Sequence, residues 1–448
     1  VKADFDSEMD RDAECGTLYG RLVCKLGETE GILPFEATGV AELVRLGARL
    51  TDDQRKLSTA FSRVADVIRE SDYWARQEGA PAVCGTHVRR AIEERVYRSD
   101  LIAEKIRGLI FDGTLLIDLA GSKAGQVNGL AVADLGDYSF GRPSRVTASV
   151  GVGAAGVVNI ERESQLSGRT FDKGVLILEG YLRNTYAREH ALALTAGIAM
   201  EQSYGGIDGD SASVAELLSL LSARAGVPLR QDLAVTGSIN QRGEVQAVGG
   251  INDKIEGFFD VCRARGLTGS QGVCIPASNV KNLILRPAVT EAVSTGTFHV
   301  WSASHVDQAM QLFSGIPAGN VAVPDSFHGR VMKRLREMEA ALKPRHGAAP
   351  ERLIAVPAAP GGTGTRRGGA SHVPGPSCER RASAVGRPES NGRRARPDAR
   401  GSVPVGFASN RRRDERCPAR PLCRPARRPA AGGPRHSGGR GPRATGRR

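Results

Sequence analysis

The sequence lacks several features that would define common classes of protein. It contains no run of about 18 apolar residues, so a membrane span is not expected. It has no GxxxxGK[ST] motif, so the chain cannot bind ATP through a Walker A loop. No signal peptide opens it, its histidines form no HExxH motif and its eight cysteines form no CxxC pair. We therefore expect a cytoplasmic protein with reduced thiols and no bound metal.

Basic charge is concentrated in residues 343–448. This segment holds 25 of the 62 basic residues but only 6 of the 49 acidic ones, so the first 342 residues carry a net charge of −6. The net positive charge of the whole chain therefore does not predict a nucleic-acid-binding function for the folded part. Because the segment is dominated by Arg, Pro, Gly and Ala and has few apolar anchors, we predict that it is disordered.

Two origins of this basic segment stay open. A natural tail of this kind could bind DNA or RNA, in a salt-sensitive way. Alternatively, GC-rich DNA translated in a shifted frame gives many Arg and almost no Lys, and only one of the 25 basic residues here is a lysine. Resequencing the gene near codon 330 separates these interpretations.

Apolar periodicity divides the rest of the chain into three parts. Residues 1–107 predict a small helical bundle, in which Thr86 is a candidate N-cap. Residues 108–315 alternate between strand-like and helix-like segments, which predicts one α+β domain. Residues 316–342 add a helix at about 327–342.

Within the α+β part, individual elements can be predicted from their periods. Strands are expected at residues 125–132, 144–152, 157–163, 174–178, 233–236 and 272–275, and helices at about 212–225 and 251–265. Residues 151–156 match GxGxxG, but the next segment alternates like a strand, so we predict a glycine-rich hairpin and no dinucleotide site. An SxxK motif at 278–281 has no KTG or SDN companion.

A serine stands where one predicted helix begins. Residues 205–213 read GGIDGDSAS, which puts Ser211 on a glycine turn at a helix N-terminus. Unpaired amides there could stabilise the oxyanion of acyl transfer by about 3–4 kcal/mol. The alternative is structural, since Asp208, Asp210 or Ser211 could simply cap the helix.

A lysine in the second predicted helix is the candidate base. Lys254 lies in the first turn of the helix at 251–265, beside the buried stripe that contains Ile251 and Ile255. Partial burial and the positive end of the helix would lower its pKa from about 10.4, and an uncharged amine can take the proton of a serine. The alternative is a surface lysine paired with a neighbouring carboxylate.

Together these segments resemble the peptidase domain of the Lon proteases over about residues 125–315. The resemblance rests on DGDSAS at 208–213, PLRQDLAVTGS at 228–238 and GGINDKIEGFF at 249–259. These segments occur in the family's order, and 43 positions separate Ser211 from Lys254, as in the family's pattern. The resemblance implies Ser211 as the nucleophile, Lys254 as the general base and Thr236 as a support for the lysine.

The resemblance also implies roles for residues before the serine. Asp208 matches the acidic residue of the preceding loop, and Gly209 and Asp210 would line the oxyanion region together with Ser211. Glu201, followed by Gln202, falls where the archaeal-like branch has residues near the site.

The first hundred residues are similar to the helical lid of the AAA+ module in this family. Residues 53–58 (DQRKLS) and 71–76 (SDYWAR) resemble a bacterial Lon-related subgroup. Arg49, in Gly47-Ala-Arg49, would be a sensor-type arginine that contacts nucleotide. The ATPase core with its Walker motifs is missing from this sequence. We therefore expect the chain alone to bind no cofactor, while ATP and Mg²⁺ are implied for the full-length family.

The sequence thus predicts a serine endopeptidase that acts by acyl transfer. By resemblance it would form a homo-hexamer and degrade unfolded or misfolded proteins in protein quality control. The alternative is a catalytically silent truncated fragment that serves as an oligomerisation or chaperone module. Because both reactive side chains are present, the sequence favours the enzyme.

Overall fold

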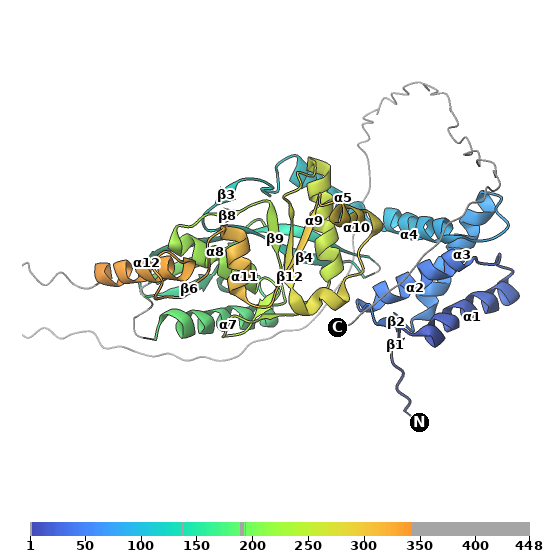
Figure 1. Ribbon diagram of the computed structural model, residues 1–448, viewed down its shortest axis with the longest axis horizontal. Helices are drawn as coiled ribbons and strands as arrows, with labels where there is room; N and C mark the ends of the chain where they lie inside the picture. Colours follow the sequence, from blue (N-terminus) through green and yellow to red (C-terminus); the bar gives the residue numbers. More distant parts are fainter. Residues whose placement is uncertain (1, 137, 189–191, 193, 343–448) are drawn as a thin grey trace, which may run out of the picture. The chain divides into compact units, whose positions relative to one another are not determined.

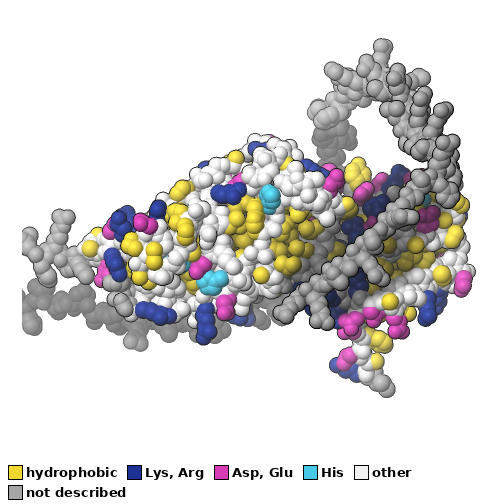
Figure 2. Space-filling model, viewed as in Figure 1, with side chains coloured by type: hydrophobic (Ala, Val, Ile, Leu, Met, Phe, Trp, Pro, Cys, Tyr) yellow, Lys and Arg dark blue, Asp and Glu magenta, His cyan; other side chains and the backbone are white. Residues whose placement is uncertain are grey.

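The computed structural model describes every residue except 1, 137, 189–191, 193 and 343–448. The basic segment therefore lies outside the described residues, and its disorder and DNA binding stay predictions. None of the described helices is long and apolar enough to cross a membrane. Figure 2 shows acidic and basic side chains interspersed over the visible face of the described residues, which agrees with the small net charge of this part of the sequence.

A helical unit with one short sheet forms the N-terminal part (Figure 1). Its elements are β1 (Glu8–Asp10), α1 (Ala13–Glu30), α2 (Ala37–Thr51), β2 (Lys56–Ser58), α3 (Phe61–Gln77), α4 (Gly85–Ser99) and α5 (Leu101–Phe111). The first four helices share an apolar core that includes Tyr19, Leu43 and Val88. Cys84, and not the predicted Thr86, is the N-cap of α4, because its sulfur and His87 form a reciprocal capping box.

The second part is built around a mixed sheet (Figure 1). Its strands are β3 (Ser122–Lys123), β4 (Gln126–Asp134), β5 (Ser139–Val152), β6 (Gly156–Asn159), β7 (Leu194–Met200), β8 (Leu229–Arg230), β9 (Leu233–Val235), β10 (Ser238–Ile239), β11 (Val245–Gln246), β12 (Gly272–Pro276) and β13 (His299–Ala303). Its helices are α6 (Ile160–Glu163), α7 (Arg169–Tyr186), α8 (Ser213–Ala225), α9 (Ile251–Arg265), the 3₁₀ helix η1 (Ala277–Asn282), α10 (Pro287–Ser294), α11 (Val306–Ser314) and α12 (Phe327–Leu342).

Seven strands of this part form one sheet in the order β13-β12-β9-β4-β5-β7-β6. The strands from β13 to β4 run parallel, β5 is antiparallel to both of its neighbours, and β6 runs parallel to β7. Helices and strands therefore share one mixed domain, as the α+β prediction required.

Side chains of the central strands alternate between two apolar clusters. In β9, Leu233 and Val235 join the cluster that contains residues of α7, α8, α11 and α12, whereas Ala234 joins the cluster of α9 and α10. In β12, Cys274 belongs to the first cluster and Val273 to the second. Because successive strand residues point to opposite faces, α8 and α9 cover opposite faces of the sheet.

Several predicted elements are confirmed and two are wrong. The helices predicted at 251–265 and about 327–342 have those bounds in the structure. The segment 174–178 is no strand but part of α7, where Phe171, Val175 and Leu178 are buried at helical spacing. The strand predicted at 157–163 ends at Asn159, and α6 follows it.

The glycine-rich hairpin is also corrected. Residues 153–155 do form the turn between β5 and β6, but the two strands do not pair with each other. Instead β7 lies between them and pairs with both. The turn therefore carries the chain across the end of β7.

Candidate active site

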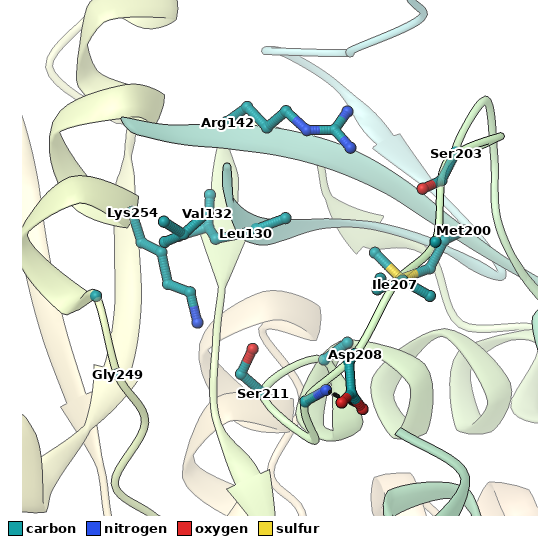
Figure 3. Close-up of a pocket in the computed structure, with 15 residues that line it drawn as sticks. Leu130, Val132, Arg142, Met200, Ser203, Ile207, Asp208, Ser211, Gly249 and Lys254 are labelled. Carbon is teal, nitrogen blue, oxygen red and sulfur yellow. Dashed lines mark hydrogen bonds between the residues drawn. The ribbon is translucent and has the colours of Figure 1, made fainter. Parts of the chain in front are cut away.

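A pocket of about 350 Å³ lies where the starts of α8 and α9 approach β4 and β5 (Figure 3). Residues 203–212 precede α8 and carry Ser211, whereas Gly249 and Gly250 precede α9, which carries Lys254. Leu130 and Val132 of β4 also line the space. The two residues that the sequence singled out, 43 positions apart, thus face the same pocket.

Ser211 is held through its backbone. Its carbonyl oxygen accepts hydrogen bonds from Thr236 Oγ1 at 3.2 Å and from the Gly237 amide at 2.9 Å. Its hydroxyl has no hydrogen-bond partner among the described residues, and Figure 3 shows it directed into the pocket. The side chain is therefore free for chemistry while its backbone is fixed.

Lys254 is a buried amine on the opposite side of this space. Its residue is 3% exposed, and Nζ donates a hydrogen bond of 3.1 Å to Thr236 Oγ1. Burial lowers the pKa of Lys254 to about 8, against the opposing effect of the Asp210 carboxylate. Within the described residues no hydrogen bond joins Nζ directly to Ser211, but the amine points toward the serine hydroxyl (Figure 3). Thr236 links the two residues, since it contacts both.

Asp208 fixes the loop before the serine. Its Oδ1 accepts hydrogen bonds from the amides of Thr170 at 3.0 Å, Phe171 at 3.1 Å and Gly209 at 2.8 Å. These amide contacts lower the pKa of the carboxyl group, so it is ionised at neutral pH. The first two amides belong to the N-terminal turn of α7. Asp208 therefore caps α7, and not the helix that follows it in the sequence.

The amides of this loop are not equivalent. Asp208 occupies the amide of Gly209, whereas the amides of Asp210 and Ser211 have no hydrogen-bond partner in the part of the chain that the structure describes. The Asp210 carboxylate accepts a hydrogen bond of 2.7 Å from Ser238 Oγ. The N-cap of α8 is Ala212, with no side-chain cap, so the capping alternative for Asp208, Asp210 and Ser211 does not describe this helix. Two amides next to the nucleophile remain available for an oxyanion.

Comparison with known protein families agrees with this geometry. Residues 34–98 match the family model described as archaeal LonB, AAA+ ATPase LID domain. Residues 197–313, which include Ser211, Thr236 and Lys254, match the Lon protease (S16) C-terminal proteolytic domain. The chain thus contains a segment similar to the LonB LID domain and a Lon-type proteolytic domain.

Individual proteins named as Lon proteases or Lon protease homologs are similar to much of this chain. A putative Lon protease homolog of Escherichia coli (strain K12) is 37% identical over 303 residues, which are 67% of this chain and 51% of that protein. A putative Lon protease homolog of Haemophilus influenzae is 34% identical over 276 residues, 61% of this chain and 45% of that protein. An archaeal Lon protease of Archaeoglobus fulgidus is 25% identical over 323 residues, 72% of this chain and 48% of that protein. The chain thus spans about half the length of these curated relatives.

Glu201 and Gln202 lie beside this pocket without lining it. Glu201 Oε1 accepts a hydrogen bond of 2.9 Å from Thr147 Oγ1. The side chain of Gln202 accepts from the Leu116 amide at 2.7 Å and donates to the Thr114 carbonyl oxygen at 2.7 Å. In this arrangement both residues hold neighbouring backbone and strand segments, and neither contacts Ser211 or Lys254.

Arg49 of the LonB-type lid contacts the helix that carries the lysine. Its terminal nitrogens donate to Glu256 Oε1 at 2.8 Å and to Asp253 Oδ1 at 2.7 Å, and one also donates to the Ile284 carbonyl oxygen at 2.6 Å. The carboxylates that could have paired with Lys254 are therefore paired with Arg49. Both terminal nitrogens of Arg49 are thus paired with protein groups in this structure, and nucleotide contact by Arg49 stays a prediction.

Several residues that shape the rest of the pocket were not predicted from the sequence. Arg142 of β5 lines it, as do Ser203 and Met200 at the end of β7. Leu130 and Val132 were assigned to a strand, but period-two alternation does not reveal which strand face meets a loop from elsewhere in the chain. Arg142 also lies before the strand predicted at 144–152, and Arg145 stands on the same observed strand, so no signal in the sequence singled out Arg142.

Proposed function

We propose that this chain is the proteolytic part of an ATP-dependent Lon-type serine endopeptidase with a Ser211–Lys254 dyad. The observation that carries the proposal is a buried amine, with its pKa lowered to about 8, that faces an unpartnered serine hydroxyl across a pocket. A lysine of this kind is partly uncharged near neutral pH and can act as a general base. Thr236 supports the lysine by accepting its hydrogen bond.

In the proposed reaction, Ser211 Oγ attacks the carbonyl carbon of a peptide bond while Lys254 Nζ takes the serine proton. The amides of Asp210 and Ser211 donate to the oxyanion of the tetrahedral intermediate. Lys254 then gives its proton to the leaving amine, and an ester to Ser211 remains. Water, activated by the same amine, hydrolyses this ester and restores the serine.

The wider assembly is part of the same proposal. We expect a cytoplasmic homo-hexamer that degrades unfolded or misfolded chains, and the names of the relatives support only the protease activity in this expectation. All five cysteines in the described residues are free, which suits a reducing compartment. ATP and Mg²⁺ would be bound by the ATPase core of a full-length Lon protein, and this chain alone would bind no cofactor.

Covalent labelling tests the proposal. The full chain is incubated with a fluorophosphonate probe, and the modified peptide is located by mass spectrometry. We expect one adduct, on Ser211, and parallel loss of casein hydrolysis, with a peptide boronate as a reversible competitor. An assembled chain that takes no label at Ser211 and hydrolyses no casein would instead be an oligomerisation or chaperone module.

The pH profile should follow the lysine. Because the uncharged amine is the reactive form, kcat/KM for a small peptide is expected to rise with pH and to level off above about pH 8. Below the pKa the rate should fall about tenfold per pH unit. Initial rates measured from about pH 6 to about pH 9.5 check this, and a profile that is flat or falls across this range contradicts the assignment of the base.

A buried carboxyl group supplies the control for this experiment. Glu216 of α8 is 2% exposed, and burial followed by the nearby Glu161 carboxylate raises its pKa to about 8. Because the folded protein holds the Glu216 proton more tightly than the unfolded chain does, protonated Glu216 contributes to the free energy of unfolding. This contribution is fully present below the unfolded-state pKa, near 4.5, and is lost as pH rises through about 8. Glu216→Gln should remove that loss of stability and keep the hydrogen bond from Asn159, while the activity profile keeps its midpoint.

A further inference from the structure

Arg142 is a cation in the pocket that has no partner among the described residues. Arg142 lies on β5, where it pairs with Ala131 of β4, and its guanidinium extends toward the side of the pocket where Ser203 lies (Figure 3). In the described part of the chain its side chain makes no hydrogen bond or ion pair. Burial is the only cause that shifts the pKa of Arg142, and it lowers it. No nearby carboxylate therefore compensates the guanidinium for its lost hydration. Arg145 on the same strand differs, since Asp118 accepts its hydrogen bond at 3.0 Å.

The acidic groups around the pocket are already occupied. Asp208 accepts three backbone amides, and Asp210 accepts the hydroxyl of Ser238. Asp253, whose backbone lies against the strand next to Arg142, pairs with Arg49 and accepts a hydrogen bond from Ser139. The protein therefore leaves Arg142 as a half-buried cation that is directed toward the space a substrate would fill.

A guanidinium in this state favours one class of ligand. Its planar fork matches the two oxygens of a carboxylate, and such charge-assisted hydrogen bonds are stronger where water is excluded. The sheet fixes the backbone of Arg142 on one side, where it pairs with Ala131 of β4, whereas β7 pairs with β5 only from Val146 onward. A neutral substrate side chain at the same place would leave the positive charge of Arg142 without a negative partner.

We propose that Arg142 is a specificity-determining residue that binds an aspartate or glutamate side chain of the substrate close to the scissile bond. This inference rests on the proposed function, since it names the kind of peptide that the dyad cleaves best. The other group that Arg142 could bind is a backbone carbonyl oxygen of the substrate, which would give no preference for acidic residues.

The test uses the full chain and quenched fluorescent peptides that differ only in Glu or Gln at one position near the scissile bond. For the unaltered chain, kcat/KM is expected to favour Glu at one position by about tenfold or more, which is typical of a hydrogen-bonded charge pair. In Arg142→Met and Arg142→Gln this ratio should fall to about one. Arg142→Glu should reverse the preference toward a Lys-containing peptide.

Controls separate this inference from the function on which it rests. Arg183→Met, at an arginine on α7 whose side chain is 62% exposed, should keep the Glu preference of the unaltered chain. Thermal unfolding of each variant shows whether it is folded. No Glu preference, or an equal loss for all peptides in Arg142→Met, overturns the role of Arg142 while the peptidase stands. If no cleavage depends on Ser211, the proposed function fails, and this inference fails with it.

Discussion

Ser211→Ala and Lys254→Met are each expected to abolish casein hydrolysis, with a loss on the order of 10⁴-fold or more. The first change removes the nucleophile, and the second removes the group that accepts its proton. Because the two side chains act in one proton transfer, the double variant should be no slower than either single variant. Initial rates of casein and peptide hydrolysis measure all three.

Neither substitution should unfold the domain. Ser211 accepts its hydrogen bonds through its carbonyl oxygen, which alanine keeps. Methionine has nearly the shape of Lys254 and removes an amine that is poorly solvated in the pocket. Lys173→Met, at an exposed lysine on α7, is the matched control and should retain full activity. Substantial hydrolysis by folded Lys254→Met would exclude the lysine as the base.

Gly257→Ala is expected to reduce both stability and activity. A Cβ atom at Gly257 would lie 2.0 Å from the carbonyl oxygen of Gly141, and a Cβ atom at Gly141 would lie equally close to the Asp253 carbonyl oxygen. Here α9 contacts β5 backbone to backbone, and neither carbonyl can rotate away. The helix must therefore move outward, which should lower the free energy of unfolding by about 1–3 kcal/mol.

The same shift should displace the base, because Lys254 lies one turn before Gly257 on α9. A displacement of about 1 Å in a catalytic group can reduce turnover on the order of 10²-fold. Gly108→Ala in α5 is the control, since nothing lies within 4 Å of its added Cβ atom, and it should stabilise by up to about 1 kcal/mol. Thermal unfolding and peptide hydrolysis measure both effects, and unchanged values for Gly257→Ala would contradict the close helix–strand contact.

The helix that follows Ser211 and the helix that carries Lys254 could be predicted because their local patterns agree with their tertiary setting. Ile251 and Ile255 mark the buried stripe of α9, and this stripe gave the correct bounds of the helix. The strand predicted at 174–178 is wrong because a glycine followed by four apolar residues fits a buried strand or one side of a helix equally well. Burial of Phe171 and Leu182, beyond that run, identifies the helix.

Pocket residues were harder to predict than the dyad. Arg142 is 69 positions before Ser211 in sequence, and only the folded sheet brings its strand to the pocket. Glu201 illustrates the converse, since it is close to Ser203 in sequence, but its side chain turns toward Thr147. Neighbourhood in the chain therefore predicted membership of the pocket poorly, because the chain turns at Glu201 and Gln202, where Gln202 has a φ of 56°.

The serine loop is anchored at both ends, to α7 through Asp208 and to the segment after β9 through the Ser211 carbonyl. Its conformational entropy is consequently lost once, during folding, and not again at each encounter with a peptide. A nucleophile mounted in this way meets successive substrates in the same orientation. The reactive orientation of Ser211 is then set by folding, and substrate binding needs to order only the incoming polypeptide.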